Sequence, residues 1–278
     1  MAHIYLDTNL WNISCDQELD PQVLLRRLDQ EGSTLVLSLN AIDELSRTFL
    51  RPDSWQRAKK LFLHLDEYLK SGLRCFTKEN PELLKAEMWA FQGVANSQKF
   101  LASEDVAKIG DLVSKYASGD LPEGCLDGLT VQTRLAQHER LKTASNLLVQ
   151  SALASELAAI EESDFPIWAE QQLQSATAIR LMGEKLSALF PAVTAIELYE
   201  WSNALIKNRS RIATAMLKAD FYYNWRCARR GSNRKDLLDD LSHVINASYC
   251  DVYATEETNQ SQYARLILDS TAGGPYMK

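Results

Sequence analysis

The sequence predicts an α/β protein whose parallel sheet is built from both ends of the chain. Short apolar runs alternate with helical patterns over residues 1–80, and the same alternation returns over residues 226–270. Between them, residues 81–225 show long helical patterns and few strand signals. We therefore expect one discontinuous α/β domain, 1–80 with 226–270, and a helical insertion or subdomain over 81–225.

The first 80 residues read as alternating strands and helices. Residues 3–6 are an apolar run that stops at Asp7-Thr8-Asn9, which indicates a buried strand ending in a polar turn. A helix is predicted over 21–30 and a second buried strand over 34–38. Asn40 is a suitable cap for a helix over 40–49 that carries Glu44. A further helix over 54–70 and a third strand over 73–76 complete this half.

The C-terminal part repeats the same alternation. Apolar residues at helical spacing predict a helix over 234–249, and residues 251–255 read as a strand. A short helix over 260–268 follows. Residues 271–278 contain Gly-Gly-Pro and are expected to be a loose tail.

Composition is that of an ordinary globular protein. The 278 residues include 30 Lys+Arg and 37 Asp+Glu, for a net charge of −7, and 46% are hydrophobic. The sequence has no run of eighteen apolar residues, so we expect no membrane-spanning helix. The first residues lack the features of a signal peptide. The five cysteines are scattered and never spaced as CxxC, so we expect a cytoplasmic protein with reduced thiols.

Four acidic residues occupy comparable places around the predicted sheet. Asp7 and Glu257 follow the first and last strands, Glu44 lies early in the helix after the second strand, and Asp240 lies in the helix before the last strand. The carboxyl ends of parallel strands meet at one crevice, so the four side chains are expected to converge there. Clustered carboxylates repel one another unless a hard cation neutralises them, and oxygen ligands suit Mg²⁺ or Mn²⁺. Hydrolysis of a phosphodiester by an activated water fits such a site.

The segments that carry these acids resemble the four motifs of PIN-domain nucleases. They are IYLDTN at 4–9, SLNAIDEL at 38–45, DLSHVINA at 240–247 and DVYATEE at 251–257. The resemblance implies a PIN-like three-layer α/β/α fold with a central, mostly parallel sheet. It also implies catalytic, metal-binding roles for Asp7, Glu44, Asp240 and Glu257, with Thr8, Asn9 and Thr255 as polar supports.

Two departures from the family pattern leave alternatives open. Glu257 stands where the family usually has Asp, so Asp251 or Glu256 are alternates for the fourth position. The helical insertion is also larger than in the compact toxin-type members. Asp239 competes with Asp240, and His243 shares a helical face with Asp240 as a further polar support or a buried histidine bonded to backbone.

A basic stretch precedes the helix of Asp240. Residues 201–235 hold nine basic residues and one acid, with Phe221, Tyr222, Tyr223 and Trp225 interleaved. Basic side chains neutralise phosphates and aromatic rings stack on unpaired bases, although a solvated helix face with a buried aromatic side fits equally well. The residues predicted to bind nucleic acid are Lys207, Arg209, Arg211, Arg226, Arg229, Arg230, Arg234 and Lys235.

Taken together, these features predict a Mg²⁺- or Mn²⁺-dependent ribonuclease that acts as an endonuclease. The alternative is a PIN-like module that binds nucleic acid or a partner without turnover, and a DNA-directed nuclease is a third interpretation. No phosphate-binding loop, GxGxxG, HExxH or GxSxG motif is present. The helical insertion leaves open a homodimer or a protein partner, and no membrane association is expected.

Overall fold

A parallel sheet lies at the centre of the molecule. The computed structural model describes residues 2–94, 98–121, 153–230, 237–268 and 276–277. The strands have the order β3-β2-β1-β4-β5 and all pair in parallel. They are β1 (Ala2–Leu6), β2 (Ser33–Ser38), β3 (Cys75–Thr77), β4 (Val252–Ala254) and β5 (Tyr276–Met277). The four strands expected from the sequence are confirmed.

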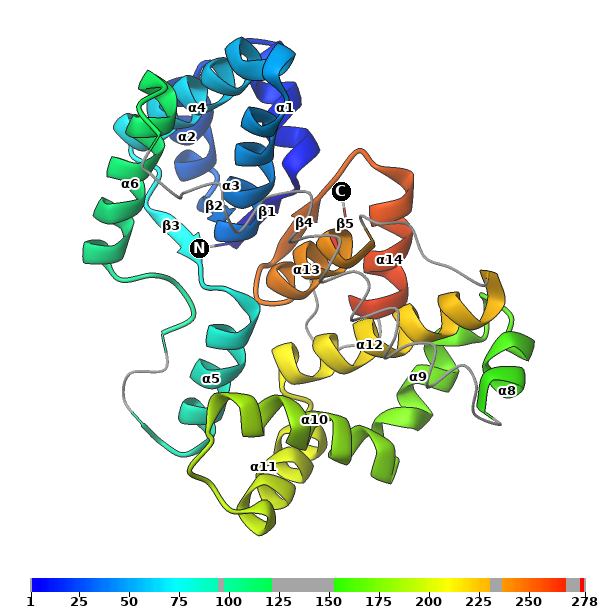
Figure 1. Ribbon diagram of the computed structural model, residues 1–278. Coiled ribbons are helices and arrows are strands. Elements are labelled where there is room, and N and C mark those ends of the chain that lie inside the picture. The colour runs from blue at the N-terminus through cyan, green and yellow to red at the C-terminus, as the bar shows by residue number, and fades with distance from the viewer. Residues whose placement is uncertain (1, 95–97, 122–152, 231–236, 269–275, 278) are drawn as a thin grey trace.

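One face of the sheet is covered by helices from the first part of the chain (Figure 1). They are α1 (Thr8–Asp16), α2 (Pro21–Gln30), α3 (Leu39–Ser46), α4 (Trp55–Lys70) and α6 (Ser103–Ser118), with short 3₁₀ turns at Arg47–Leu50 and Pro52–Ser54. Their apolar sides enclose Leu35, Leu37 and Phe76 of the sheet in one core cluster.

The other face is covered by the remaining helices, drawn from cyan-green to red in Figure 1. They are α5 (Asn80–Phe91), α8 (Leu153–Ala159), α9 (Phe165–Leu173), α10 (Ala176–Leu189), α11 (Ala195–Lys207), α12 (Arg211–Arg230), α13 (Leu237–Ala247) and α14 (Thr258–Leu268). Their cluster includes Tyr5, Val36 and Tyr253. Tyr5 is in register with both other residues, so the three side chains leave the same face of the pleat. The architecture is α/β/α.

The described part of the predicted insertion, within 81–225, is helical, as expected, but it has no separate core. Helix α6 packs against α4 in the first layer, whereas α12 shares its buried side chains with α13, α14 and the sheet. The boundaries at 80 and 225 therefore do not divide two hydrophobic cores. Whether this segment is an insertion relative to other proteins stays a prediction.

Three local predictions are corrected. Thr8 and Asn9 are not in a turn but open α1, because Asp7 caps that helix by accepting a hydrogen bond from Leu10 N at 2.9 Å. Helix α3 is capped by Ser38, whose Oγ accepts from Ala41 N at 3.0 Å, and not by Asn40. The expected loose tail over 271–278 is wrong for Tyr276–Met277, which pair with β4, and its other residues lie outside the described ranges.

Two further expectations concern membrane-spanning helices and the state of the cysteines. Among the described helices, none is long and apolar enough to cross a membrane. Cys15, Cys75, Cys227 and Cys250 are free thiols, and Cys125 lies outside the described residues.

Candidate functional site

Asp7 lies at the carboxyl end of the central strand β1. Its side chain is fully buried, and its second carboxylate oxygen accepts a hydrogen bond from Thr255, just past β4. Burial raises the pKa of Asp7, and the charge of Glu257 raises it further against the opposing hydrogen bonds of Thr255 and Leu10. The central acid of the predicted site is therefore costly to ionise in the folded protein.

Glu257 and Asn9 lie beside Asp7. Asn9 donates a hydrogen bond to Glu257, and the backbone N–H of Glu257 donates to Thr255 Oγ1 at 3.0 Å. Thr255 thereby connects the ends of β1 and β4. The structure thus brings together Asp7, Asn9, Thr255 and Glu257.

The alternates for the fourth position lie elsewhere. Asp251 precedes β4, at the opposite edge of the sheet, where it accepts a hydrogen bond from the backbone N–H of His3 at 2.7 Å. Glu256 is exposed, whereas its neighbour Glu257 is half-buried. Of the three acids at this position, Glu257 is the one that the structure places near Asp7.

Glu44 belongs to a hydrogen-bonded group that also includes Thr8 and His243. Thr8 Oγ1 donates to Glu44 Oε2 at 2.6 Å, and His243 Nε2 lies 2.8 Å from the same oxygen. Burial works to raise the pKa of Glu44, but the hydrogen bond and charge of His243, with Thr8 and Arg47, hold that pKa below its ordinary value. His243 bonds side chains, so the interpretation of a histidine satisfied by backbone is wrong.

Tyr5 and Ser38 complete this group, and the sequence reasoning missed both. Tyr5 donates to Ser38 Oγ at 2.8 Å, and its hydroxyl lies 2.6 Å from His243 Nδ1. The available signal was the two-residue period of β1, which places Tyr5 and Asp7 on the same face. Ser38 is the last residue of β2 and Asp7 is the first residue after β1, so both lie at the carboxyl ends of neighbouring strands.

Asp240 is buried in the first turn of α13 and bonds Gln260, which sequence reasoning also missed. Gln260 donates to Asp240 Oδ1 at 3.3 Å and accepts from the hydroxyl of Tyr253. Burial places the pKa of Tyr253 well above its ordinary value, with Asp7 and Asp240 among the charges that raise it. The neighbouring Asp239 instead forms an ion pair with Arg47, through both oxygens, at 2.8 and 3.1 Å.

The donor set suits a hard cation. Asp7 and Glu257 offer carboxylate oxygens at one edge of the sheet, and Asp240 is connected to Tyr253 of β4 through Gln260. Oxygen-only ligands fit Mg²⁺ or Mn²⁺. Within the described ranges, however, no three His, Cys, Asp or Glu side chains are already arranged to hold a metal ion. Binding would require side chains such as Glu257 to exchange a protein hydrogen bond for the cation.

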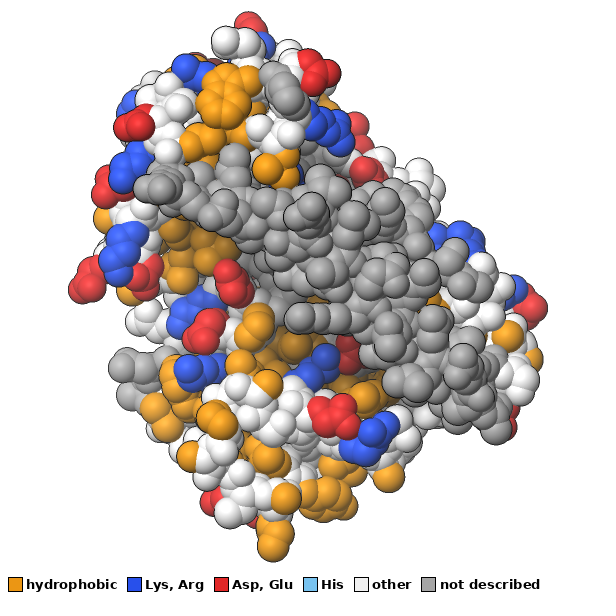
Figure 2. Space-filling view, in the orientation of Figure 1, with side chains coloured by type: hydrophobic (Ala, Val, Ile, Leu, Met, Phe, Trp, Pro, Cys, Tyr) orange, Lys and Arg blue, Asp and Glu red, His pale blue; other side chains and the backbone are white. Residues whose placement is uncertain are grey.

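The basic stretch does not form the predicted nucleic-acid surface as a whole. Arg226 is buried and donates to the hydroxyls of Tyr222 and Tyr263 at 3.0 and 2.7 Å, so it is not available to a phosphate. Phe221, Tyr222, Tyr223 and Trp225 are core residues and cannot stack on bases. Figure 2 shows Lys and Arg scattered among acidic and apolar side chains on the face in view.

The other predicted basic residues differ in their surroundings. Arg229 donates to the backbone oxygen of Ile160 at 3.2 Å and pairs with Glu161, while Arg230 and Lys207 are exposed. Arg211 is half-buried at the start of α12, and Arg209 pairs with Glu170. Arg234 and Lys235 lie outside the described residues.

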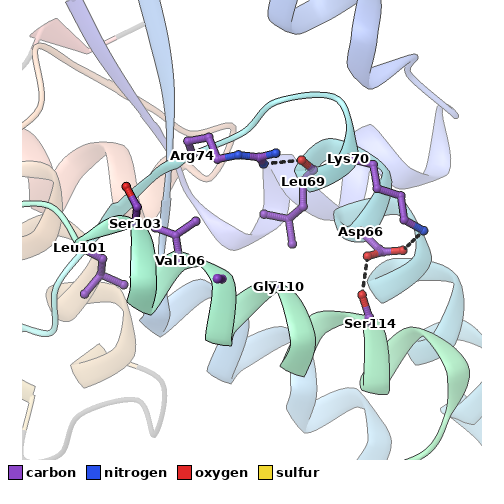
Figure 3. A pocket seen from close by; sticks show the side chains of 10 residues that line it. Asp66, Leu69, Lys70, Arg74, Leu101, Ser103, Val106, Gly110 and Ser114 are labelled. Atoms are coloured by element: carbon purple, nitrogen blue, oxygen red, sulfur yellow. Dashed lines mark hydrogen bonds and ion pairs between the residues drawn. The ribbon is translucent and has the colours of Figure 1, made fainter.

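The main hollows found among the described residues are not lined by Asp7, Glu44, Asp240 or Glu257. One of about 520 Å³ lies between α4 and α6 (Figure 3). In it, Asp66 accepts from Ser114 at 2.7 Å and pairs with Lys70, while Arg74 donates to backbone oxygens of Leu69 and Leu73. These charged groups bond one another, Ser114 or the backbone. We therefore interpret their contacts as part of the packing of α4 against α6 and not as a binding site.

Comparison with protein-family models, curated proteins and solved structures found no match to this chain. The resemblance to PIN-domain nucleases therefore rests on the residues quoted above and stays a prediction. The structure contributes their spatial arrangement: two linked groups of side chains, one around Asp7 and Glu257, the other around Glu44 and His243.

Proposed function

We propose that this protein is a divalent-metal-dependent nuclease that hydrolyses phosphodiester bonds, with RNA preferred over DNA. One observation carries the proposal: acids from distant parts of the chain meet at the carboxyl edge of a parallel sheet, with Asp7 and Glu257 bridged by Thr255. The preference for RNA follows from the resemblance of these segments to PIN-domain nucleases.

Asp7 and Glu257 are the residues that would hold the cation, with Asp240 as a third acid that would have to move toward them. The cation, when bound, supplies positive charge that activates water and stabilises the charge developing on phosphorus. Asp7 suits this role because it is buried, held in place by the hydrogen bond that it accepts from Leu10 N as the cap of α1, and placed next to a second carboxylate. A positive charge there would relieve the repulsion between the two acids.

Glu44 acts as a positioning residue in this proposal. Its carboxylate is held by Thr8 on one side and by His243 on the other, and Tyr5 holds the far nitrogen of His243. This chain of hydrogen bonds fixes the orientation of a negative charge next to the Asp7 group. It would orient water or the cation's ligands more readily than bind the cation itself.

A second candidate is a nucleic-acid or partner-binding module without turnover. It is favoured by the fact that Asp7, Glu44, Asp240 and Glu257 each already accept a hydrogen bond from another protein group. A carboxylate with a satisfied protein partner gains less from a cation than one without.

The test is cleavage of labelled single-stranded RNA and DNA with Mg²⁺, Mn²⁺ or EDTA. Asp7→Asn removes the central charge, and Asp251→Asn is its matched control, because it makes the same change at the opposite edge of the sheet. We expect chelator-sensitive cleavage that is lost in Asp7→Asn and retained in Asp251→Asn. Mn²⁺ binding by calorimetry, weakened in Asp7→Asn but without cleavage by wild type, would favour the binding module instead. If wild type neither binds Mn²⁺ nor cleaves RNA or DNA, the metal-dependent nuclease is refuted.

A further inference from the structure

A second polar hollow lies among the helices remote from the sheet. It has a volume of about 330 Å³ and lies between α9, α10, α11 and the turn into α12. Leu173, Ile179 and Ile206 give it apolar walls, and Gln174 and Asn203 line it with amide side chains. An apolar slot edged by a few polar groups is the usual form of a small-molecule site, and this volume suits a ligand of modest size.

The lining of this hollow carries excess positive charge. Lys207 and Arg209 line it together with a single carboxylate, Glu170. Glu170 is already neutralised from within the protein by Lys218, whose side chain is fully buried. Arg209 Nη1 lies 3.1 Å from the other oxygen of Glu170, and Lys207 has no acidic partner among the described residues. The hollow therefore favours an anion.

The backbone at Arg209 has a conformation that favours glycine, which provides a substitution for testing the role of its side chain. Its φ is +49°, in the left-handed region that favours glycine. Arg209 N donates to Ile206 O and Ser210 N donates to Leu205 O, both at 3.0 Å, which is the hydrogen-bond pattern of a helix end that usually has glycine at this position. A non-glycine residue there costs about 1 kcal/mol relative to glycine.

We propose that this hollow binds a phosphorylated nucleoside, independently of the nuclease function proposed above. Lys207 and Arg209 bind the phosphate, and the apolar walls enclose the base. Gln174 and Asn203 form hydrogen bonds with the edge of the base. Paired donors and acceptors of amide side chains match the edges of nucleobases, and cations match phosphate. The shared chemistry fits either a free mononucleotide or the 5′-phosphorylated terminal nucleotide of an RNA strand.

The test is calorimetric binding of AMP, adenosine and inorganic phosphate to the full chain in EDTA. Arg209→Gly removes the guanidinium while giving the backbone the residue it prefers, so the variant is expected to fold at least as stably as wild type. Glu18→Gly is the matched control. Glu18 also has a positive φ, +51°, at the end of α1 with the same two hydrogen bonds, far from the hollow in sequence and on the other layer.

We expect AMP to bind more tightly than either adenosine or phosphate alone, and Arg209→Gly and Lys207→Ala each to weaken it about tenfold or more. Glu18→Gly should bind AMP as wild type does. Failure of AMP to bind, equal binding of phosphate and AMP, or unchanged affinity in both pocket variants would refute the proposal. A short 5′-phosphorylated oligoribonucleotide, compared with its unphosphorylated form in an Asp7→Asn background, separates the two sources. If the phosphorylated oligoribonucleotide binds more tightly than AMP, the natural ligand is an RNA end. If it binds more weakly than AMP, the natural ligand is a free nucleotide.

Discussion

The contact between Glu44 and His243 gives the sharpest prediction about how the candidate site is held together. Substituting His243→Leu leaves Thr8 as the only hydrogen-bond donor to the Glu44 carboxylate among the described residues, and it removes the imidazole from Tyr5. A hydrogen bond to a charged group contributes about 1.5–3 kcal/mol, and the neutral bond to Tyr5 about 0.5–1.5 kcal/mol. We expect His243→Leu to lower the free energy of unfolding by about 2–4 kcal/mol.

A double-mutant cycle isolates the pair itself. His243 is almost fully buried, but the side chain of Glu44 is 34% exposed, so solvent screens part of the interaction. We expect a coupling of about 1–2 kcal/mol between His243→Leu and Glu44→Gln, measured by urea unfolding followed by tryptophan fluorescence. Additive effects of the two substitutions, or a loss below about 0.5 kcal/mol in His243→Leu, would show that the pair does not stabilise the fold.

The pH dependence of the same variants provides an independent check. The pKa of Glu44 lies below its ordinary value of 4.5, so the folded state binds fewer protons there than the unfolded state. The stabilisation is present above about pH 4.5 and is lost as the pH falls through the pKa of Glu44 in the folded protein. Glu44→Gln should lack this contribution, and an unchanged acid limb would contradict the assignment of charge to Glu44.

Three further predictions concern stability. Asp7→Asn should unfold at higher urea than wild type at pH 7 in EDTA, and the difference should shrink on acidification, because the pKa of Asp7 is raised and its ionisation opposes folding. The opposite order at pH 7 would contradict the burial argument. Arg226→Met should cost about 2–4 kcal/mol by leaving two buried hydroxyls without their donor, whereas Arg230→Met, at an exposed site, should stay within about 0.5 kcal/mol in the same urea assay. Ser38→Ala should cost about 1–2 kcal/mol, since it removes both the cap of α3 and the acceptor for Tyr5, and melting curves would detect the loss.

The sheet was predictable because its strands are short apolar runs bounded by polar residues, and β1 and β2 follow that pattern closely. Helix α1 escaped prediction because its sequence, TNLWNISCD, contains weak helix formers. Its stability comes from the Asp7 cap and from burying Trp11 and Cys15 against α4, which are tertiary effects. Residues Tyr276–Met277 pair only because β4 offers a free edge, and no local signal reveals that.

The candidate site was predictable in its acids but not in their partners. Asp7 and Glu257 follow strands, and Glu44 and Asp240 lie in the helices after β2 and before β4, which is visible in the sequence. The hydrogen bonds of His243 to Tyr5 and Glu44 join segments roughly 200 residues or more apart, and spacing does not encode them. The basic stretch was wrongly predicted to present Arg226 and its aromatic neighbours to nucleic acid. Helix α12 is buried along much of its length, so these side chains face the core.

The pairing of β1 with β4 has a consequence for the order in which the protein folds. Asp7 and Thr255 are 248 residues apart, and the central strand has one neighbour, β2, from early in the chain and one from its far end. Contacts of such high sequence separation form late, since the intervening chain must first be brought together. During synthesis, β1, β2 and α3 can assemble first, but Asp7 meets Thr255 and Glu257 only after residue 257 has emerged. A growing chain therefore carries the first half of the candidate site without the second.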